Sequence, residues 1–153
     1  MTRTNPIAAA PDALAALTEL SSASAEGLPP ALAQLVSLHV SQLNGCVYCT
    51  GLHRDGALAA GQPALKLEAL ARWADSPDFT PGERAALGLA EHLTRPSGGA
   101  VPEDVHAEAA RHLGDAAAAR VIWTVAAVNA WNRVGIATAA PLAGRRPAVQ
   151  EGV

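Results

Sequence analysis

Charged residues and cysteines are both scarce in this chain. Only 16% of its 153 residues are Asp, Glu, Lys or Arg, and 50% are hydrophobic. The net charge of −3 comes with no basic stripe that could release counterions from a phosphate backbone, which excludes nucleic-acid binding. A small domain with so little charge is expected to cover apolar surface by contact with further copies of itself, as a homo-oligomer.

Long apolar runs are lacking as well. No stretch reaches the ~20 uninterrupted apolar residues that a membrane-spanning helix needs, and the N-terminus has no apolar signal core. The most apolar window, residues 116–140, is interrupted by Arg120, Asn129, Asn132 and Arg133. We therefore expect a cytoplasmic protein that makes no membrane contact.

Strand signals are nearly absent, because no sustained alternation of β-branched or aromatic residues occurs. The length suits one domain with a real core. We expect a single all-α domain over residues 1–142, with about six to seven helices, followed by a loose tail over residues 143–153. Apolar periodicity and stop signals predict helices over residues 11–20, 30–43, 45–60, 64–74, 81–93, 102–113 and 114–137.

Local signals refine some of these boundaries. Thr80-Pro81-Gly82-Glu83 carries a capping box with proline at the first helical position. Asn44 is expected to cap the helix that begins at Gly45. The polar stretch after Leu20 is expected to be a loop. Trp123 and Trp131 are expected to lie in the core.

The chain's two cysteines lie close together in sequence. Cys46 and Cys49 form a Cys-x-x-Cys motif, and His53 follows four residues after the second cysteine. On a helix the three positions i, i+3 and i+7 share one face. In a reducing compartment a lone motif of this kind is more typical of catalysis or metal binding than of a permanent cross-link.

Two influences that lower the pKa of a thiol point to different sulfurs here. Cys46 lies in the first turn of its predicted helix, where the helix dipole favours negative charge. Cys49 has His53 one turn away. Spacing alone does not choose between the two sulfurs. With either as the nucleophile, oxidation to a sulfenic acid can close a disulfide, which an external dithiol reopens.

Plainer interpretations of these residues remain open. The cysteines could be an inert buried pair, and His39 is read first as a core or rim histidine. Zinc would need a fourth ligand, which only a tertiary contact of His39 could supply. The polar segment 129–133 within an apolar helix either fixes contacts between helices or lines a pocket.

The run Leu35 to Cys49, with His53 following, resembles the AhpD-like branch of the carboxymuconolactone decarboxylase superfamily. Its string Ser-Gln-x-Asn-Gly-Cys-x-x-Cys-x-x-x-His is far more restrictive than Cys-x-x-Cys alone. Residues 83–95 and 129–133 resemble later helices of the same family, so the resemblance covers roughly residues 29–138.

The resemblance implies an all-α fold that assembles into trimers or hexamers, and a peroxidase that reduces small organic hydroperoxides without a cofactor or metal. Carried over, Cys49 would attack the peroxide, Cys46 would resolve the sulfenic acid as a disulfide, and His53 would assist proton transfer. The reductant would be a dithiol partner such as a lipoylated protein.

One position departs from the family pattern. The relay usually includes a glutamate twelve residues before the first cysteine, where this chain has Gln34. Glutamine holds a hydrogen bond but does not exchange a proton at neutral pH. Loss of a general base costs on the order of 10²–10⁴ in rate. His39, further along the same predicted helix, is considered as a substitute.

Three functions are therefore weighed. The first is a thiol peroxidase that acts through Cys49. The second is a dithiol–disulfide oxidoreductase or redox sensor with weak peroxidase activity, which Gln34 favours. The third is a non-redox enzyme such as a lactone decarboxylase, for which the cysteines would be dispensable.

Overall fold

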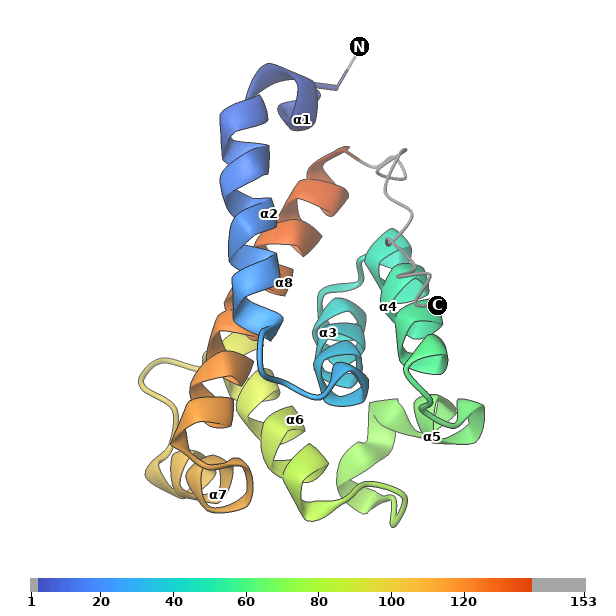
Figure 1. Ribbon diagram of the computed structural model, residues 1–153, viewed down its shortest axis with the longest axis vertical. Coiled ribbons are helices and arrows are strands. Elements are labelled where there is room, and N and C mark those ends of the chain that lie inside the picture. The colour runs from blue at the N-terminus through green and yellow to red at the C-terminus, as the bar shows by residue number, and fades with distance from the viewer. Residues whose placement is uncertain (1–2, 139–153) are drawn as a thin grey trace.

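The computed structural model describes residues 3–138, and these residues form helices and connecting loops without a strand (Figure 1). The all-α expectation is confirmed. The elements in chain order are α1 (Pro6–Ala9), α2 (Pro11–Ala25), α3 (Pro30–Asn44), α4 (Val47–Ala59), α5 (Ala64–Glu68), the 3₁₀ helix η1 (Leu70–Asp75), α6 (Pro81–Thr94), α7 (Glu103–Leu113) and α8 (Asp115–Thr138).

The expected number of six to seven helices is too low for the described residues. Asn5 caps the extra short helix α1 through its side chain, and Pro11 begins a new helix directly afterwards. The single helix expected over 64–74 is divided into α5 and η1, and Arg72 within η1 has non-helical dihedral angles. The tail expected over 143–153 lies outside the described residues.

The helix expected to end at Leu20 continues to Ala25 as α2. Its serines were read as loop formers because Ser side chains compete for backbone groups. Within α2 they bond the helix's own carbonyls instead, as Ser21 does with Leu17. The C-terminal end of α2 is also tied to α8, since Thr124 donates to the carbonyl of Ser24. Tertiary packing on α8 thus extends α2 past its local stop signal.

The turn before α4 differs from expectation. Asn44 does not cap α4, because it is the last residue of α3 and its side chain amide donates to Asn132 at 2.8 Å. Gly45 takes the left-handed conformation, φ 68°, and ends α3. Cys46 is then the N-cap of α4. The capping box expected at Thr80 is present as predicted.

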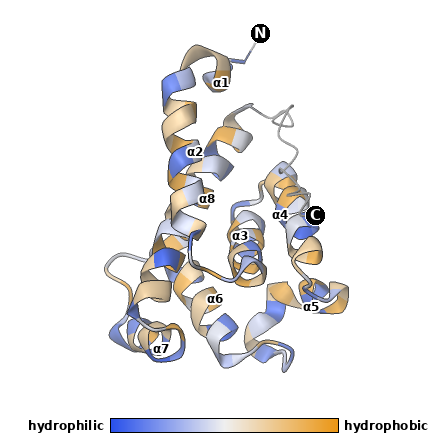
Figure 2. Cartoon of the chain, in the orientation of Figure 1, coloured by the Kyte–Doolittle hydropathy of each residue, from blue (hydrophilic) through white to orange (hydrophobic). Residues whose placement is uncertain are grey.

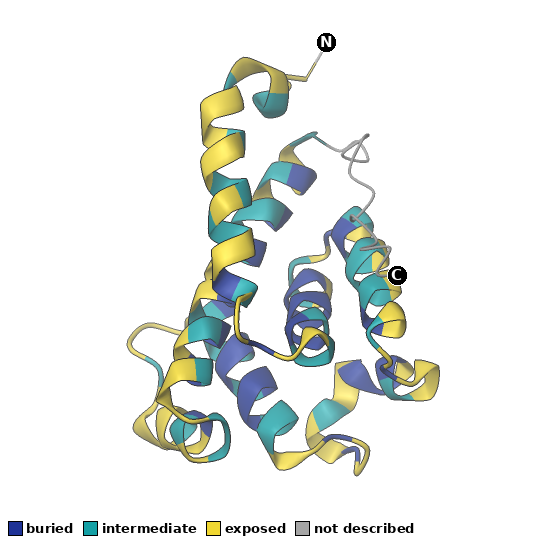
Figure 3. Cartoon of the chain, viewed as in Figure 1, coloured by how far each residue is buried: buried dark blue, intermediate teal, exposed yellow. Residues whose placement is uncertain are grey.

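Helix α3 lies in the centre of the domain and packs against α4, α6 and α8 (Figure 1). Seven consecutive residues of α3, 35–41, are buried, so this helix has no solvent-facing side over that length (Figure 3). Val36 and Val40 join one apolar cluster with α6, α7 and α8, while Leu35 and Leu38 join a second with α4, η1 and α6. One enclosed helix therefore connects the two halves of the core.

Helix α8 is apolar over most of its length (Figure 2), and this hides which face is buried. Val121, Val125 and Val128 are buried at helical spacing. Trp123 lies on the other side of the helix and is 55% exposed, so the expectation that it belongs to the core is wrong. Within residues 3–138, no helix is long and apolar enough to cross a membrane.

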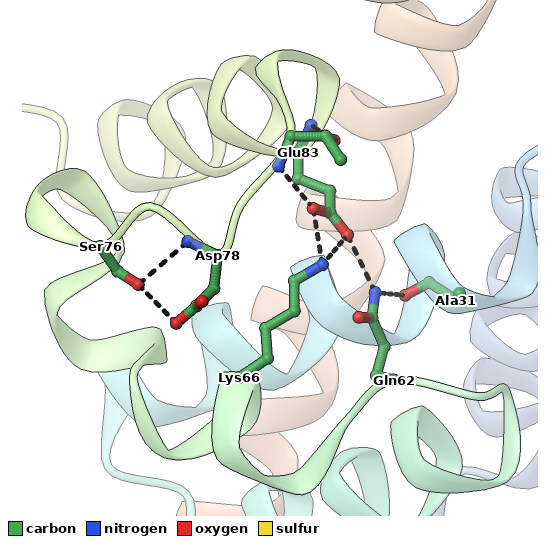
Figure 4. Close-up of polar contacts among 7 residues, drawn as sticks. Ala31, Gln62, Lys66, Ser76, Asp78 and Glu83 are labelled. Atoms are coloured by element: carbon green, nitrogen blue, oxygen red, sulfur yellow. Dashed lines mark hydrogen bonds and ion pairs between the residues drawn. The ribbon is translucent and has the colours of Figure 1, made fainter.

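A polar cluster ties the start of α6 to α5 (Figure 4). Both Glu83 carboxylate oxygens accept from Lys66, at 2.6 and 2.7 Å, and Gln62 donates to the same carboxylate. The side chains of Lys66 and Glu83 are each only 12% exposed. Burial alone would raise the pKa of Glu83, but the bonds from Lys66, Thr80 and Gln62 outweigh it and lower that pKa.

We predict that Glu83→Gln destabilises the protein by about 2 kcal/mol, because it leaves the Lys66 ammonium sheltered without a counter-charge. Urea unfolding at pH 7 measures the change. The matched control is Glu108→Gln, which breaks the exposed pair with Arg111 and should leave the unfolding midpoint almost unchanged. Equal midpoint shifts in the two variants would show that the sheltered Lys66–Glu83 pair contributes no more to stability than the exposed pair does.

Candidate functional site

The two cysteines are joined by a disulfide at the start of α4. Cys46 is the N-cap, and its sulfur accepts the backbone N–H of Cys49 at 3.4 Å. Because α4 begins at Val47, the Cys46 sulfur lies at the end of the helix where free N–H groups favour thiolate over thiol. Each cysteine is only 3% exposed. The structure therefore places a redox-capable pair in a sheltered, electropositive position.

Helix α8 covers the disulfide with a glycine. A Cβ atom built on Gly135 would lie 3.1 Å from the Cys46 sulfur and 3.4 Å from the Cys49 sulfur. The first distance is shorter than ordinary van der Waals contact. Gly135 thus leaves the space that the paired sulfurs occupy, and sequence reasoning did not single it out.

His53 forms its hydrogen bond with Gln34. Its Nδ1 lies 3.0 Å from Oε1 of Gln34 on α3. An amide oxygen only accepts, so Nδ1 carries the proton and Nε2 keeps a free lone pair. This tautomer makes Nε2 a possible proton acceptor. A Cβ on Gly56 would come within 2.6 Å of the same oxygen, so Gly56 is what allows Gln34 to approach.

A cavity of about 590 Å³ opens beside these groups, a size typical of small-molecule sites. Cys49 lines it, and Cys46 is not among the lining residues. Gln34, His53 and Trp131 also face it. The other described lining residues come from α2, α3, α4 and α8, namely Thr18, Ser21, Ser22, Ser24, Ala25, Ala33, Ser37, Tyr48, Leu52, Gly56, Thr124, Ala127 and Val128.

His39 lies apart from this cavity. Its Nε2 is 2.9 Å from Oε1 of Glu91 on α6, and the same oxygen accepts the indole N–H of Trp73. Burial lowers the pKa of His39 more than Glu91 raises it. The structure therefore brings Cys49, His53 and Gln34 together and leaves His39 in a separate cluster against α6 and η1.

An amide network holds the C-terminal end of α3 against α8. Asn44 donates to the side chain oxygens of Asn129 and Asn132, at 3.0 and 2.8 Å. Asn132 in turn donates to the hydroxyl of Ser41. Asn129 and Asn132 belong to the polar segment 129–133. This segment therefore fixes contacts between helices, and its Trp131 also lines the cavity.

The comparisons with known proteins agree with this fold. The model of the carboxymuconolactone decarboxylase family matches residues 11–92. The chain belongs to this family. It is 30% identical over 104 residues to the uncharacterized protein YdfG of Bacillus subtilis strain 168, a match that covers 68% of this chain and 71% of that protein.

A solved structure extends the likeness to most of the fold. It is the crystal structure of a protein of unknown function from Agrobacterium tumefaciens that carries the provisional description of an antioxidant defence protein, AhpD. The TM-score is 0.85 at 27% identity, and the match covers 92% of this chain and 97% of the other. The AhpD-like resemblance is thereby confirmed.

Several residues that line the cavity of this protein were not predicted from the sequence. Ser21, Ser22 and Ser24 were assigned to a loop, although α2 carries them to the cavity wall. Trp131 was expected in the core, yet it is partly exposed at the cavity and its indole N–H donates to Ser21 at 2.6 Å. Among residues 3–138 no group of three or more His, Cys, Asp or Glu side chains is arranged to hold a metal ion.

Burial sets the protonation state of His53. It lowers the pKa of His53 from 6.5 to about 4. The folded protein then binds this proton less readily than the unfolded chain does. Stability from His53 is fully present above about pH 6.5 and is lost as the pH falls toward 4.

We predict that wild-type protein, in its disulfide form, loses about 2 kcal/mol more stability than His53→Gln between pH 7 and 4.5. Urea unfolding at both pH values measures the difference. His39→Gln is the comparison that removes the other buried histidine. An equal pH response of wild type and His53→Gln would show that His53 protonates freely in the folded protein.

Proposed function

We propose that this protein is a thiol peroxidase that reduces small organic hydroperoxides through Cys49. The observation that carries the proposal is that Cys49, rather than Cys46, faces the cavity, with His53 beside it. A peroxide in the cavity reaches one sulfur of the pair, and the other sulfur is already at bonding distance behind it. The provisional antioxidant description of the structural neighbour supports the same reading.

The first chemical step forms one bond and breaks another. The Cys49 thiolate attacks the terminal oxygen of ROOH, the O–O bond breaks, and RO⁻ leaves and takes a proton to become ROH. Cys49 is then a sulfenic acid. His53 Nε2 accepts the thiol proton beforehand and can supply it to the leaving alkoxide.

The second step closes the disulfide. The Cys46 thiolate attacks the Cys49 sulfur, the S–O bond breaks, and the hydroxide takes a proton to leave as water. The N-cap position stabilises Cys46 as the thiolate that this step needs. An external dithiol then reduces the disulfide by exchange and is itself oxidised. We expect that dithiol to belong to a partner such as a lipoylated protein.

A second function is favoured by one feature of the site. With a pKa near 4, His53 is a weak base toward a thiol, and Gln34 offers no negative charge to stabilise the imidazolium. A dithiol–disulfide oxidoreductase or redox sensor needs less assistance of this kind. This alternative predicts reversible Cys46–Cys49 chemistry with slow attack on peroxides.

We predict that reduced wild-type protein loses two hydrogens rapidly when mixed with one equivalent of cumene hydroperoxide, well above the rate of a free thiol. Intact mass over milliseconds to minutes measures the reaction. Cys46→Ser should complete one oxidation and accumulate a sulfenic acid that dimedone traps. Cys49→Ser should react no faster than a free thiol. A wild-type rate equal to that of a free thiol would favour the redox-exchange function.

We predict that Gln34→Glu accelerates oxidation of Cys49 about 10- to 100-fold at pH 7, because a carboxylate at this position raises the pKa of His53 and stabilises its protonated form. The stopped-flow rate with cumene hydroperoxide is the measurement. Gln42→Glu is the matched control, since Gln42 is an exposed residue of the same helix. No gain in Gln34→Glu, or an equal gain in both variants, would show that the contact with His53 does not limit the rate.

A further inference from the structure

The cavity wall is polar in composition but offers little to an anion. No Asp, Glu, Lys or Arg is among the described residues that line it. It does carry several hydroxyl side chains, which ordinarily donate to carboxylate or phosphate oxygens. Where the serine and threonine hydroxyl protons point therefore contributes to which ligands the cavity accepts.

The serine and threonine hydroxyl protons of the lining point into the backbone. A carbonyl oxygen can only accept, so each hydroxyl bonded to one must be the donor. On α2, Thr18 donates to Leu14 at 2.8 Å and Ser21 to Leu17 at 2.8 Å. The other serine and threonine hydroxyls of the lining do the same, with Ser22 on Thr18, Ser24 on Ser21, Ser37 on Ala33 and Thr124 on Ser24.

The indole N–H of Trp131 is likewise bonded within the protein. Its N–H donates to Ser21 at 2.6 Å, so that hydroxyl oxygen already accepts one bond. These serine and threonine side chains can therefore offer a ligand only their methyl or methylene groups and their oxygen lone pairs. An anion in this cavity would lose water and gain neither a cation nor a serine or threonine donor from the described wall, where the neutral Gln34 amide and Tyr48 phenol are the remaining polar side chains beside His53.

We propose that this cavity selects electrically neutral hydroperoxides with an apolar body and excludes those that carry a carboxylate. The inference rests on the proposed function, because it names the substrates that Cys49 would meet. Apolar contacts come from Leu52, Val128 and Trp131. The neutral hydroperoxide group, itself a hydrogen-bond donor, suits a wall that presents acceptors.

Two probes that differ in charge, and otherwise only by the methyl group of an ester, test the proposal. The pair is para-carboxy cumene hydroperoxide, which is ionised at pH 7.5, and its methyl ester. Stopped-flow oxidation of the reduced protein should be at least about 30-fold slower with the carboxylate than with the ester. A free thiol measured beside the protein corrects for any intrinsic difference in reactivity. Corrected rates within threefold of each other would overturn the proposal.

A charge added at the rim of the cavity should reverse the preference. Ser22 is exposed and lines the cavity, so Ser22→Lys places an ammonium group where a carboxylate would enter. The ratio of carboxylate rate to ester rate should rise about tenfold. Ala16→Lys is the matched control, an exposed position of α2 outside the lining, and should leave the ratio unchanged. Equal ratios in both variants would count against the proposal.

Binding of the unreactive product alcohols separates this inference from the peroxidase proposal. Calorimetry on the disulfide form should show the ester alcohol binding at least about 30-fold more tightly than the carboxylate alcohol. If neither hydroperoxide outpaces a free thiol but this preference holds, the peroxidase function fails and the cavity's selectivity stands. Equal affinity, or no binding of either alcohol, would overturn the selectivity itself.

Discussion

Enclosure of the central part of α3, residues 35–41, is the constraint on which the rest of the structure depends. A buried helix cannot leave its polar side chains to water, and each must find a partner inside the protein. Apart from Ser37, which bonds a carbonyl of α3 itself, the partners of these side chains lie on other elements, so satisfying them also sets the positions of those elements. Its polar contacts are Gln34 with His53, Ser37 with Ala33, His39 with Glu91, Ser41 with Asn132, and Asn44 with Asn129 and Asn132.

The same lack of solvent gives the site its chemical character. Burial keeps His53 neutral, and the group that orients it is the uncharged amide of Gln34. The wall around them is uncharged too, among the residues described. A low-dielectric pocket makes an isolated charge costly, so a neutral residue at position 34 is compatible with the surrounding wall in a way that a lone carboxylate is not. The uncharged side chain of Gln34 therefore suits the uncharged wall around it.

Local sequence signals predicted the features that depend on near neighbours. The capping box at Thr80, the extent of α3 and the shared face of Cys49 and His53 follow from spacing along the chain. The failures come from contacts between distant segments. Asn44 bonds α8 rather than capping α4, and packing on α8 extends α2 beyond Leu20. Trp123 was misplaced because α8 is apolar on both faces, which leaves no pattern that distinguishes them.

Gly135 couples sequence change in α8 to sequence change at the start of α4 during evolution. Its missing side chain leaves room for the sulfurs at the start of α4, and a Cβ there would press on them only while both cysteines are present. Inside a long helix alanine is otherwise the more stable residue, by roughly 1 kcal/mol. A descendant that lost the cysteine pair would be free to replace the glycine, and one that replaced it first would find the pair harder to keep. Substitutions at these positions are therefore expected to occur in a preferred order during divergence.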